Sequence, residues 1–300
     1  MNVRFSLALA GLLTGSLALS ACGNSVKQTL QGAMHSVGAQ PYVQMHLTAS
    51  LSGTGANAAS AARDEAILAK LSYDVKEAST TGGAIADSSG HVNSDITVNV
   101  SGTPLVHLIE IDQTLYVNID FTVLSGFPQL GHTLVRELPV LQLTYGNRWF
   151  EVPSALLTSY LPASSKAAAA STSQMAAETK ILDAITSVIE KGNYTTTSNG
   201  YQETGRLDTL ARALAPVVAS LEHQNSTPVG HTPGTYQVSL GLDGSTATAA
   251  SVGVTAPNGA GSMSVELKAS ISHNHDAVTA PHAPTVITRQ LLQGLGLGRQ

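Results

Sequence analysis

The feature that most restricts the fold of this chain is the one-by-one alternation of apolar and polar residues in many separate segments. A period of two places every second side chain on the same face of an extended strand, whereas a helix repeats every 3.6 residues. Residues 43–51 show this pattern, with apolar side chains at every odd position. The chain therefore contains many half-buried β-strands. The same alternation recurs at residues 71–75, 96–100, 115–121, 236–242, 252–254 and 263–267.

Short turn sequences join several of these strands. Asp243-Gly244 and Asn258-Gly259 separate the last three runs, and both dipeptides favour tight hairpins because their residues accept positive φ. We therefore predict an antiparallel meander in the last third of the chain. Asp112-Gln113 predicts a further tight turn, although glycine is the preferred residue where Gln113 stands. Residues 194–204 predict a single polar strand.

Apolar residues at intervals of three and four predict helices between the strands, so the fold class is α+β. Residues 122–145 are ambiguous, because Gly126, Pro128 and Pro139 break any long helix there. The remaining helical patterns cover residues 25–37, 153–161, 173–191 and 206–221, and residues 63–70 predict a helical turn or two.

The composition excludes two classes of protein. The chain has 300 residues, of which 43% are hydrophobic and 12% are charged, so it is too apolar for a disordered tail. Its formal net charge of −5 gives no electrostatic attraction to nucleic acid, and we expect no nucleic-acid partner.

The N-terminus predicts a secretory leader and a lipid anchor. Arg4 precedes an apolar run over residues 5–21, and the run ends in small residues, as signal peptides do. The sequence Leu-Ser-Ala-Cys at residues 19–22 resembles the bacterial lipobox, in which a diacylglyceryl group is attached to the cysteine before cleavage. Cys22 is the one cysteine in the chain, which agrees with a thiol consumed by acylation. We therefore expect residues 1–21 to be removed and Cys22 to hold the protein on the extracytoplasmic face of the membrane.

Two short motifs carry a resemblance to known proteins. Residues 111–117 read IDQTLYV and residues 146–153 read GNRWFEVP. With the acylated cysteine and the order of strands and helices, they resemble the actinobacterial envelope lipoproteins of the LppX/LprG type and, more distantly, the LolA carrier fold. Those proteins usually have glycine where Gln113 stands and Gly-Lys-Trp in place of Asn147-Arg148-Trp149.

The resemblance covers residues 25–272. It implies one domain over residues 22–272, built as a strongly curved antiparallel sheet, a half-barrel, covered by helices, with an apolar cavity for acyl chains. Residues 273–300 are then a flexible, histidine-containing tail.

The apolar phases of the strands supply the candidate lipid-binding residues. The same side chains would equally form an ordinary filled core, since protein interiors are normally close-packed. The alternative is therefore a structural or partner-binding lipoprotein without a ligand. The candidate residues are Val43, Met45, Leu47, Ile96, Val98, Val100, Leu115, Val117, Ile119, Val238, Leu240, Val252, Val254, Val265 and Leu267.

No catalytic motif is found in the sequence. Neither Gly-x-Ser-x-Gly nor Ser-x-x-Lys occurs, and acylation would consume the thiol of Cys22. His273 and His275 have the spacing that places two imidazoles on one strand face, with Asp276 or His282 as a further metal ligand. The simpler interpretation is that these are solvated polar residues beyond the last strand, and we assign no metal.

The sequence thus predicts a non-enzymatic envelope lipoprotein without a cofactor. It would bind or transport a lipid or another amphiphile in an apolar cavity, with the membrane as its second partner. The sequence names no protein partner.

Overall fold

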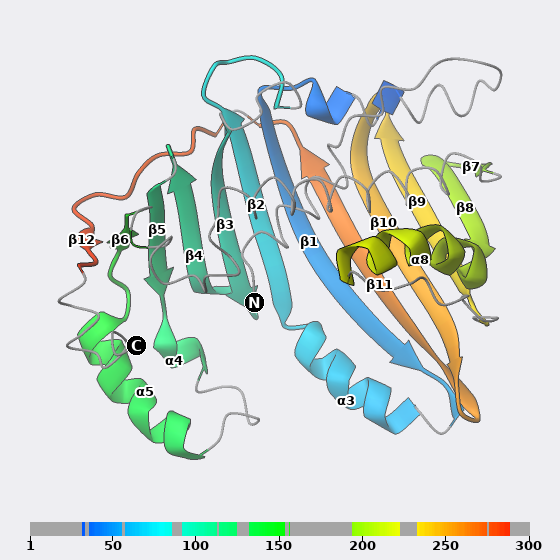
Figure 1. Cartoon of the computed structure of the whole chain (residues 1–300), viewed down its shortest axis with the longest axis horizontal. Helices are drawn as coiled ribbons and strands as arrows, with labels where there is room; N and C mark the ends of the chain where they lie inside the picture. Colours follow the sequence, from blue (N-terminus) through cyan, green and yellow to red (C-terminus); the bar gives the residue numbers. More distant parts are fainter. Residues whose placement is uncertain are drawn as a thin grey trace.

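In the computed structural model, all the strands of the described residues belong to one large sheet (Figure 1). The signal peptide predicted over residues 1–21 and Cys22 lie outside the described residues, as do most of the helices predicted over residues 153–161 and 173–191. The structure describes residues 32–33, 36–55, 58–85, 92–112, 114–124, 132–153, 156, 194–222, 233–274 and 276–288.

Twelve strands form this open sheet in the order β12-β6-β5-β4-β3-β2-β1-β11-β10-β9-β8-β7. All neighbouring strands are antiparallel except β12 and β6, which are parallel. The first strand of the chain lies beside the eleventh, so the N-terminal and C-terminal parts share one sheet. The strands are β1 (Tyr42–Gly53), β2 (Leu71–Ser79), β3 (Val92–Val100), β4 (Thr103–Ile111), β5 (Thr114–Ile119), β6 (Phe150–Val152), β7 (Tyr194–Thr197), β8 (Gly200–Arg206), β9 (Thr235–Asp243), β10 (Thr246–Asn258), β11 (Gly261–Ser272) and β12 (Thr285–Val286).

The predicted meander is confirmed in β9, β10 and β11. Gly244 and Gly259 have φ values of 62° and 61° in the two connecting turns, which is the region that glycine adopts without steric cost. Asp112 has a φ of 48° at the turn between β4 and β5, so an aspartate adopts the left-handed conformation there. The single strand predicted over residues 194–204 is wrong, because a turn at residues 198–199 folds it into the β7–β8 hairpin.

The helices α3 (Ala58–Leu68), α4 (Phe121–Leu124), α5 (His132–Tyr145) and α8 (Leu207–Glu222) accompany the strands. Residues 32–33 and 36–38 are also helical, within the helix predicted over residues 25–37 or next to its end. The helix predicted over residues 206–221 agrees with α8 to within one residue. The prediction that Pro139 breaks any long helix is wrong, since α5 is 14 residues long and contains Pro139 in its interior. A proline removes one intrahelical hydrogen bond, and the neighbouring Leu138 is buried, which holds the helix in place.

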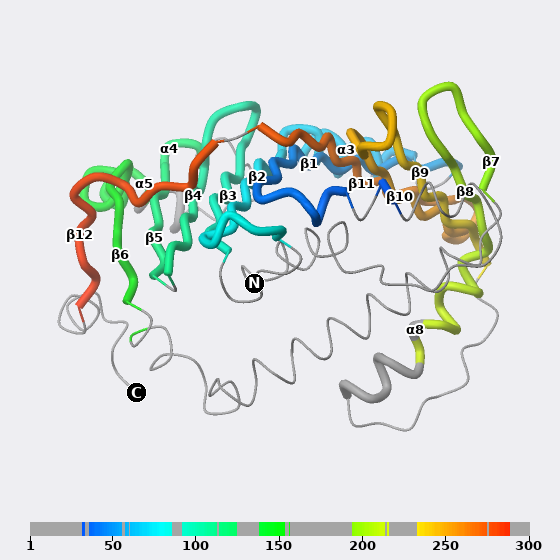
Figure 2. Tube along the Cα trace, turned by 90° about the horizontal axis from the view of Figure 1, so that it is seen from above, coloured from blue at the N-terminus to red at the C-terminus, as the bar shows by residue number. Residues whose placement is uncertain are grey.

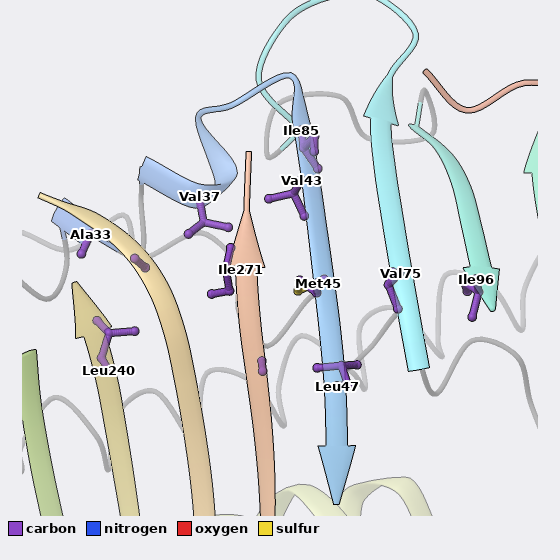
Figure 3. Packing of buried hydrophobic residues seen from close by; sticks show 12 residues of the cluster. Ala33, Val37, Val43, Met45, Leu47, Val75, Ile85, Ile96, Leu240 and Ile271 are labelled. Atoms are coloured by element: carbon purple, nitrogen blue, oxygen red, sulfur yellow. The ribbon is translucent and has the colours of Figure 1, made fainter. Parts of the chain in front are cut away.

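Two apolar clusters lie on opposite faces of the sheet. The larger one gathers around Val43, Met45 and Val75 and includes Ala33 and Val37 from the chain before β1 (Figure 3). The smaller one consists of Ala78, Ile109 and Val278, with half-buried aromatic side chains around it. The sheet therefore has a core on one side and a smaller apolar contact on the other.

Residues 273–274 and 276–288 are the described part of the tail predicted over residues 273–300. Its described part crosses the face of the smaller cluster and reaches the sheet edge, as the red segment in Figure 2 shows. There the backbone N–H of Thr285 donates to the Trp149 carbonyl at 2.8 Å, and Ile287 donates to Glu151 at 2.8 Å. The sheet therefore extends beyond the domain boundary predicted at residue 272, because Val278 and the free edge of β6 provide contacts for the chain.

Candidate functional site

All the predicted lipid-binding residues lie on one face of the sheet, which we call the apolar face. Directly paired residues of neighbouring strands point to the same side, so the strand register identifies the side chains that share a face. Val100 joins the face through its partner Leu71. The rows of paired residues across the sheet are Leu115-Glu110-Ser94-Glu77-Val43, Phe150-Val117-Leu108-Ile96-Val75-Met45-Ile271, Ile119-Val106-Val98-Tyr73-Leu47-Ala269-Ala250-Leu240-Tyr201, Ala49-Leu267-Val252-Val238-Glu203 and Leu51-Val265-Val254-Tyr236-Gly205.

The centre of the apolar face is filled. Val43, Met45 and Val75 are fully buried, and Ile96 and Leu47 are almost so. Figure 3 shows these side chains along β1, β2 and β3, with Val37 and Ile85 beside the start of β1. This part of the face is an ordinary packed core, as the alternative interpretation of the sequence requires.

Another part of the apolar face is open to solvent. Val252, Val265 and Leu267 are 44%, 44% and 39% exposed, and we call these three residues the open patch. Val252 pairs with Leu267 across β10 and β11, and Val265 lies two residues before Leu267 on the same side. Exposed apolar side chains that adjoin one another on a sheet are typical of an interaction surface rather than of free surface.

The strands β3, β4 and β5 carry a third, half-buried part of the apolar face. Its side chains include Val98, Val106 and Ile119, which pair in one row. They lie on the other side of the filled centre from the open patch. The apolar face thus has accessible apolar surface on both sides of its packed middle.

Two buried carboxyl groups interrupt the apolar face, and the sequence analysis did not single them out. Glu77 is 5% exposed, and burial raises its pKa to about 7. Glu203 is also buried, but it accepts a hydrogen bond of 2.8 Å from the hydroxyl of Tyr236. Burial and then Glu203 raise the pKa of Tyr236 well above its usual range. The sequence did contain a signal for the position of Glu77. Leu71, Tyr73, Val75 and Glu77 are two residues apart, so a strand places all four side chains on the same face.

A short polar row contains Glu77. It pairs with Ser94 of β3, which is itself 5% exposed, and Ser94 pairs with Glu110 of β4. We call these three residues the carboxyl row. Val43, the second residue of β1, lies on the other side of Glu77.

The opposite face of the sheet, which also carries the smaller apolar cluster, contains two histidine–aspartate pairs. A ring nitrogen of His46 lies 2.7 Å from a carboxylate oxygen of Asp74, and His107 lies 2.6 Å from Asp95. The His107 ring also packs edge-on against Trp149 at 4.8 Å. Among the described residues neither imidazole has a hydroxyl partner, so the pairs do not form the nucleophile–base arrangement of a hydrolase.

The histidines beyond β11 do not assemble a metal site in the part of the chain that the structure describes, where no group of three potential ligands occurs. His275 lies outside the described residues. The interpretation of His273 as a solvated side chain is wrong, because both of its ring nitrogens are buried without a hydrogen-bond partner. His282 is exposed, as is Asp276, which lies 3.7 Å from Lys76.

None of the described helices is long and apolar enough to cross a bilayer. No protein-family model matches the chain, and no curated protein matches its sequence at a significant level.

Proposed function

We propose that this chain is a cell-envelope lipoprotein that binds or transports an amphiphile through the apolar face of its sheet. The observation that carries the proposal is the open patch, in which Val252, Val265 and Leu267 are 39–44% exposed beside a fully packed core. Each methylene group removed from water contributes about 0.8 kcal/mol, so acyl chains are a favourable cover for such a surface. The proposal includes no catalytic step.

In this proposal the sheet is a half-barrel of the LppX/LprG and LolA type, with the acyl chains on its inner face. An open sheet of twelve strands with one apolar face supports this architecture. The half-buried row of Val98, Val106 and Ile119 offers a second contact for alkyl chains beside the filled centre.

The lipid anchor on Cys22 gives the proposed protein its location on the extracytoplasmic face of the membrane. Stable anchoring requires about two acyl chains, and a diacylglyceryl cysteine supplies them. An anchored protein encounters membrane lipids continually, which fits an amphiphile as the ligand. The sequence around Cys22 supports this step.

A structural or partner-binding lipoprotein is the second candidate. The packed centre around Met45 favours it, since that part of the apolar face leaves no room for a ligand. In that case the open patch would be covered by a protein surface.

Native mass spectrometry of the full-length protein, isolated from membranes, separates the two candidates. We expect a bound amphiphile whose mass disappears after solvent extraction. A Leu267→Ser variant should retain much less of it, whereas Lys268→Ser should retain the normal amount. Lys268 is the matched control, because it is the next residue of β11, is exposed and points to the opposite face. A protein that carries no amphiphile before extraction would contradict the proposed function and favour the structural alternative.

A further inference from the structure

The carboxyl row is a polar site inside the apolar face. Glu77, Ser94 and Glu110 lie in register on three neighbouring strands. Strands are spaced about 4.8 Å apart, so the two glutamates start about 10 Å from each other with Ser94 between them. Their side chains stand on the same face, and each has two methylene groups, which is enough to bring both carboxyl groups toward one small ligand group above Ser94.

The carboxyl group of Glu77 has no hydrogen bond or ion pair in the part of the chain that the structure describes, although the residue is only 5% exposed. Its pKa of about 7 results from burial alone. The other buried carboxyl groups each have at least one partner, since an oxygen of Glu203 accepts from Tyr236 and Asp208 pairs with two arginines. Buried polar groups in native proteins nearly always have a partner, so an unpartnered one indicates where a ligand group belongs.

The charges on the apolar face have one sign. Its described strands carry the carboxylates Glu77, Glu110 and Glu203. The lysines of the described strands, Lys76 and Lys268, are on the opposite face. On the apolar face, the strand register places Glu110 across Ser94 from Glu77, and Tyr73 lies four residues before Glu77 on β2. His273 follows the end of β11. A phosphate or sulfate would therefore be repelled here, whereas a cation would be attracted.

A protonated amine fits this set of groups. An ammonium group has three N–H donors and no acceptor. The row offers two carboxylates and one hydroxyl, all of which accept hydrogen bonds. Charge-assisted hydrogen bonds of this type are roughly twice as strong as neutral ones.

We propose that the carboxyl row binds the protonated amine of an amphiphile whose alkyl chain lies along the half-buried apolar side chains of β3, β4 and β5. This inference rests on the proposed function and adds the chemical class of the headgroup for an amphiphile held on β3, β4 and β5, apart from the open patch. It also assigns a role to a buried carboxyl group that would otherwise only destabilise the fold.

The test compares three probes with the same alkyl chain on the full-length protein, each below its micelle concentration. Dodecylamine, dodecanol and dodecyl sulfate are titrated near pH 8, where Glu77 is ionised. We expect dodecylamine to bind at least about tenfold more tightly than dodecanol, and dodecyl sulfate to bind most weakly. The advantage of the amine should disappear near pH 5, where Glu77 is protonated and the amine is still charged.

Two variants locate the effect. Glu77→Gln should reduce dodecylamine binding to the level of dodecanol, while Glu266→Gln, on the opposite face of β11, should leave it unchanged. Glu110→Gln changes a half-buried member of the carboxyl row and should weaken the binding of dodecylamine severalfold. This variant therefore tests the headgroup assignment if Glu77→Gln does not fold.

Equal binding of amine and alcohol, unaffected by Glu77→Gln, would overturn the headgroup assignment and leave the proposed function standing. Failure of all three probes to bind would overturn the proposed function itself.

Discussion

Replacing Glu77 by glutamine should change how the stability of the fold depends on pH. Burial raises the pKa of this carboxyl from 4.5 to about 7. Below about pH 4.5 it is protonated in both the folded and the unfolded chain and has no effect on the balance between them. Between about 4.5 and 7 the unfolded chain ionises while the folded chain keeps its proton. Glu77 therefore destabilises the fold progressively as the pH rises from about 4.5 to about 7. Above about 7 the folded chain holds a buried charge without a partner, and the loss of stability stays constant.

The magnitude follows from the two pKa values. A tenfold change in proton affinity corresponds to about 1.4 kcal/mol, so the rise from 4.5 to about 7 amounts to about 3 kcal/mol of lost stability above pH 7. Because Glu77 is 5% exposed, solvent screens this cost very little. Glutamine has nearly the same shape and is neutral at every pH. The Glu77→Gln variant should therefore gain about 3 kcal/mol relative to the natural chain between about pH 4 and pH 8.

Urea unfolding followed by circular dichroism at a series of pH values measures this difference. Other titrating groups are present in both proteins, and their contributions cancel when the two free energies of unfolding are subtracted. Glu266→Gln is the matched control, and its difference from the natural chain should stay nearly constant with pH. A constant difference for Glu77→Gln as well would refute the reasoning, because it would mean that Glu77 has the same pKa in the folded and unfolded chain.

Three further changes test the anchor, the core and the backbone, and a fourth tests an ion pair. Cys22→Ala should move the protein from the membrane pellet to the soluble fraction, and a pellet that still contains it would contradict the lipid anchor. Met45→Ala should lower the free energy of unfolding by about 2–5 kcal/mol, since Met45 is fully buried. Gly200→Ala should cost about 1–3 kcal/mol in the same assay, because Gly200 has a φ of 150° and a Cβ would collide with the Leu240 carbonyl. Asp208→Asn should destabilise more at pH 7 than at pH 3: burial acts to raise the pKa of this carboxyl, but two arginines lower it on balance, and the stability from those ion pairs is lost as the pH falls.

The assignment of side chains to faces could be predicted from the sequence. A strand has a period of two, so the phase of each run fixes which residues share a side, even when the neighbouring strands are unknown. Met45, Ile96 and Val238 come from distant segments, and the register places all three on the apolar face. The turns at Gly244 and Gly259 were predictable for a similar reason, since they depend on local backbone preferences.

The order of the strands could not be predicted in the same way. The pairing of β1 with β11 joins residues more than 200 positions apart, from Gln44 with Ser272 to Gly53 with Met263. Nothing in the local pattern of either strand specifies that partner, because it depends on the packing of the whole sheet. The path of residues 276–288 could not be predicted for the same reason, because it depends on the free edge of β6 and on the apolar contact around Val278.

The carboxyl row could be predicted from the sequence in part. The phase of β2 places Glu77 on the apolar face, so its orientation was available from the sequence. Its burial and its lack of a partner were not, because they depend on the residues that pack against the row. An acidic residue in the apolar phase of a strand is therefore a useful signal, but it becomes a candidate site only when the pairing of strands brings Ser94 and Glu110 beside it.

The open patch and the carboxyl row are too far apart for one alkyl chain to connect them. Along β1 the row lies at the level of Val43 and the patch at the level of Ala49, which is about 20 Å at 3.3 Å per residue. An acyl chain in one leaflet spans about 15 Å, half of the hydrocarbon thickness of a bilayer. A single-chain amine bound at Glu77 should therefore not touch Leu267, and Leu267→Ser should leave dodecylamine binding unchanged even though it reduces the retention of native amphiphile. If Leu267→Ser weakened dodecylamine as strongly as Glu77→Gln does, the two parts of the apolar face would form one site, and the separation derived from the strand register would be wrong.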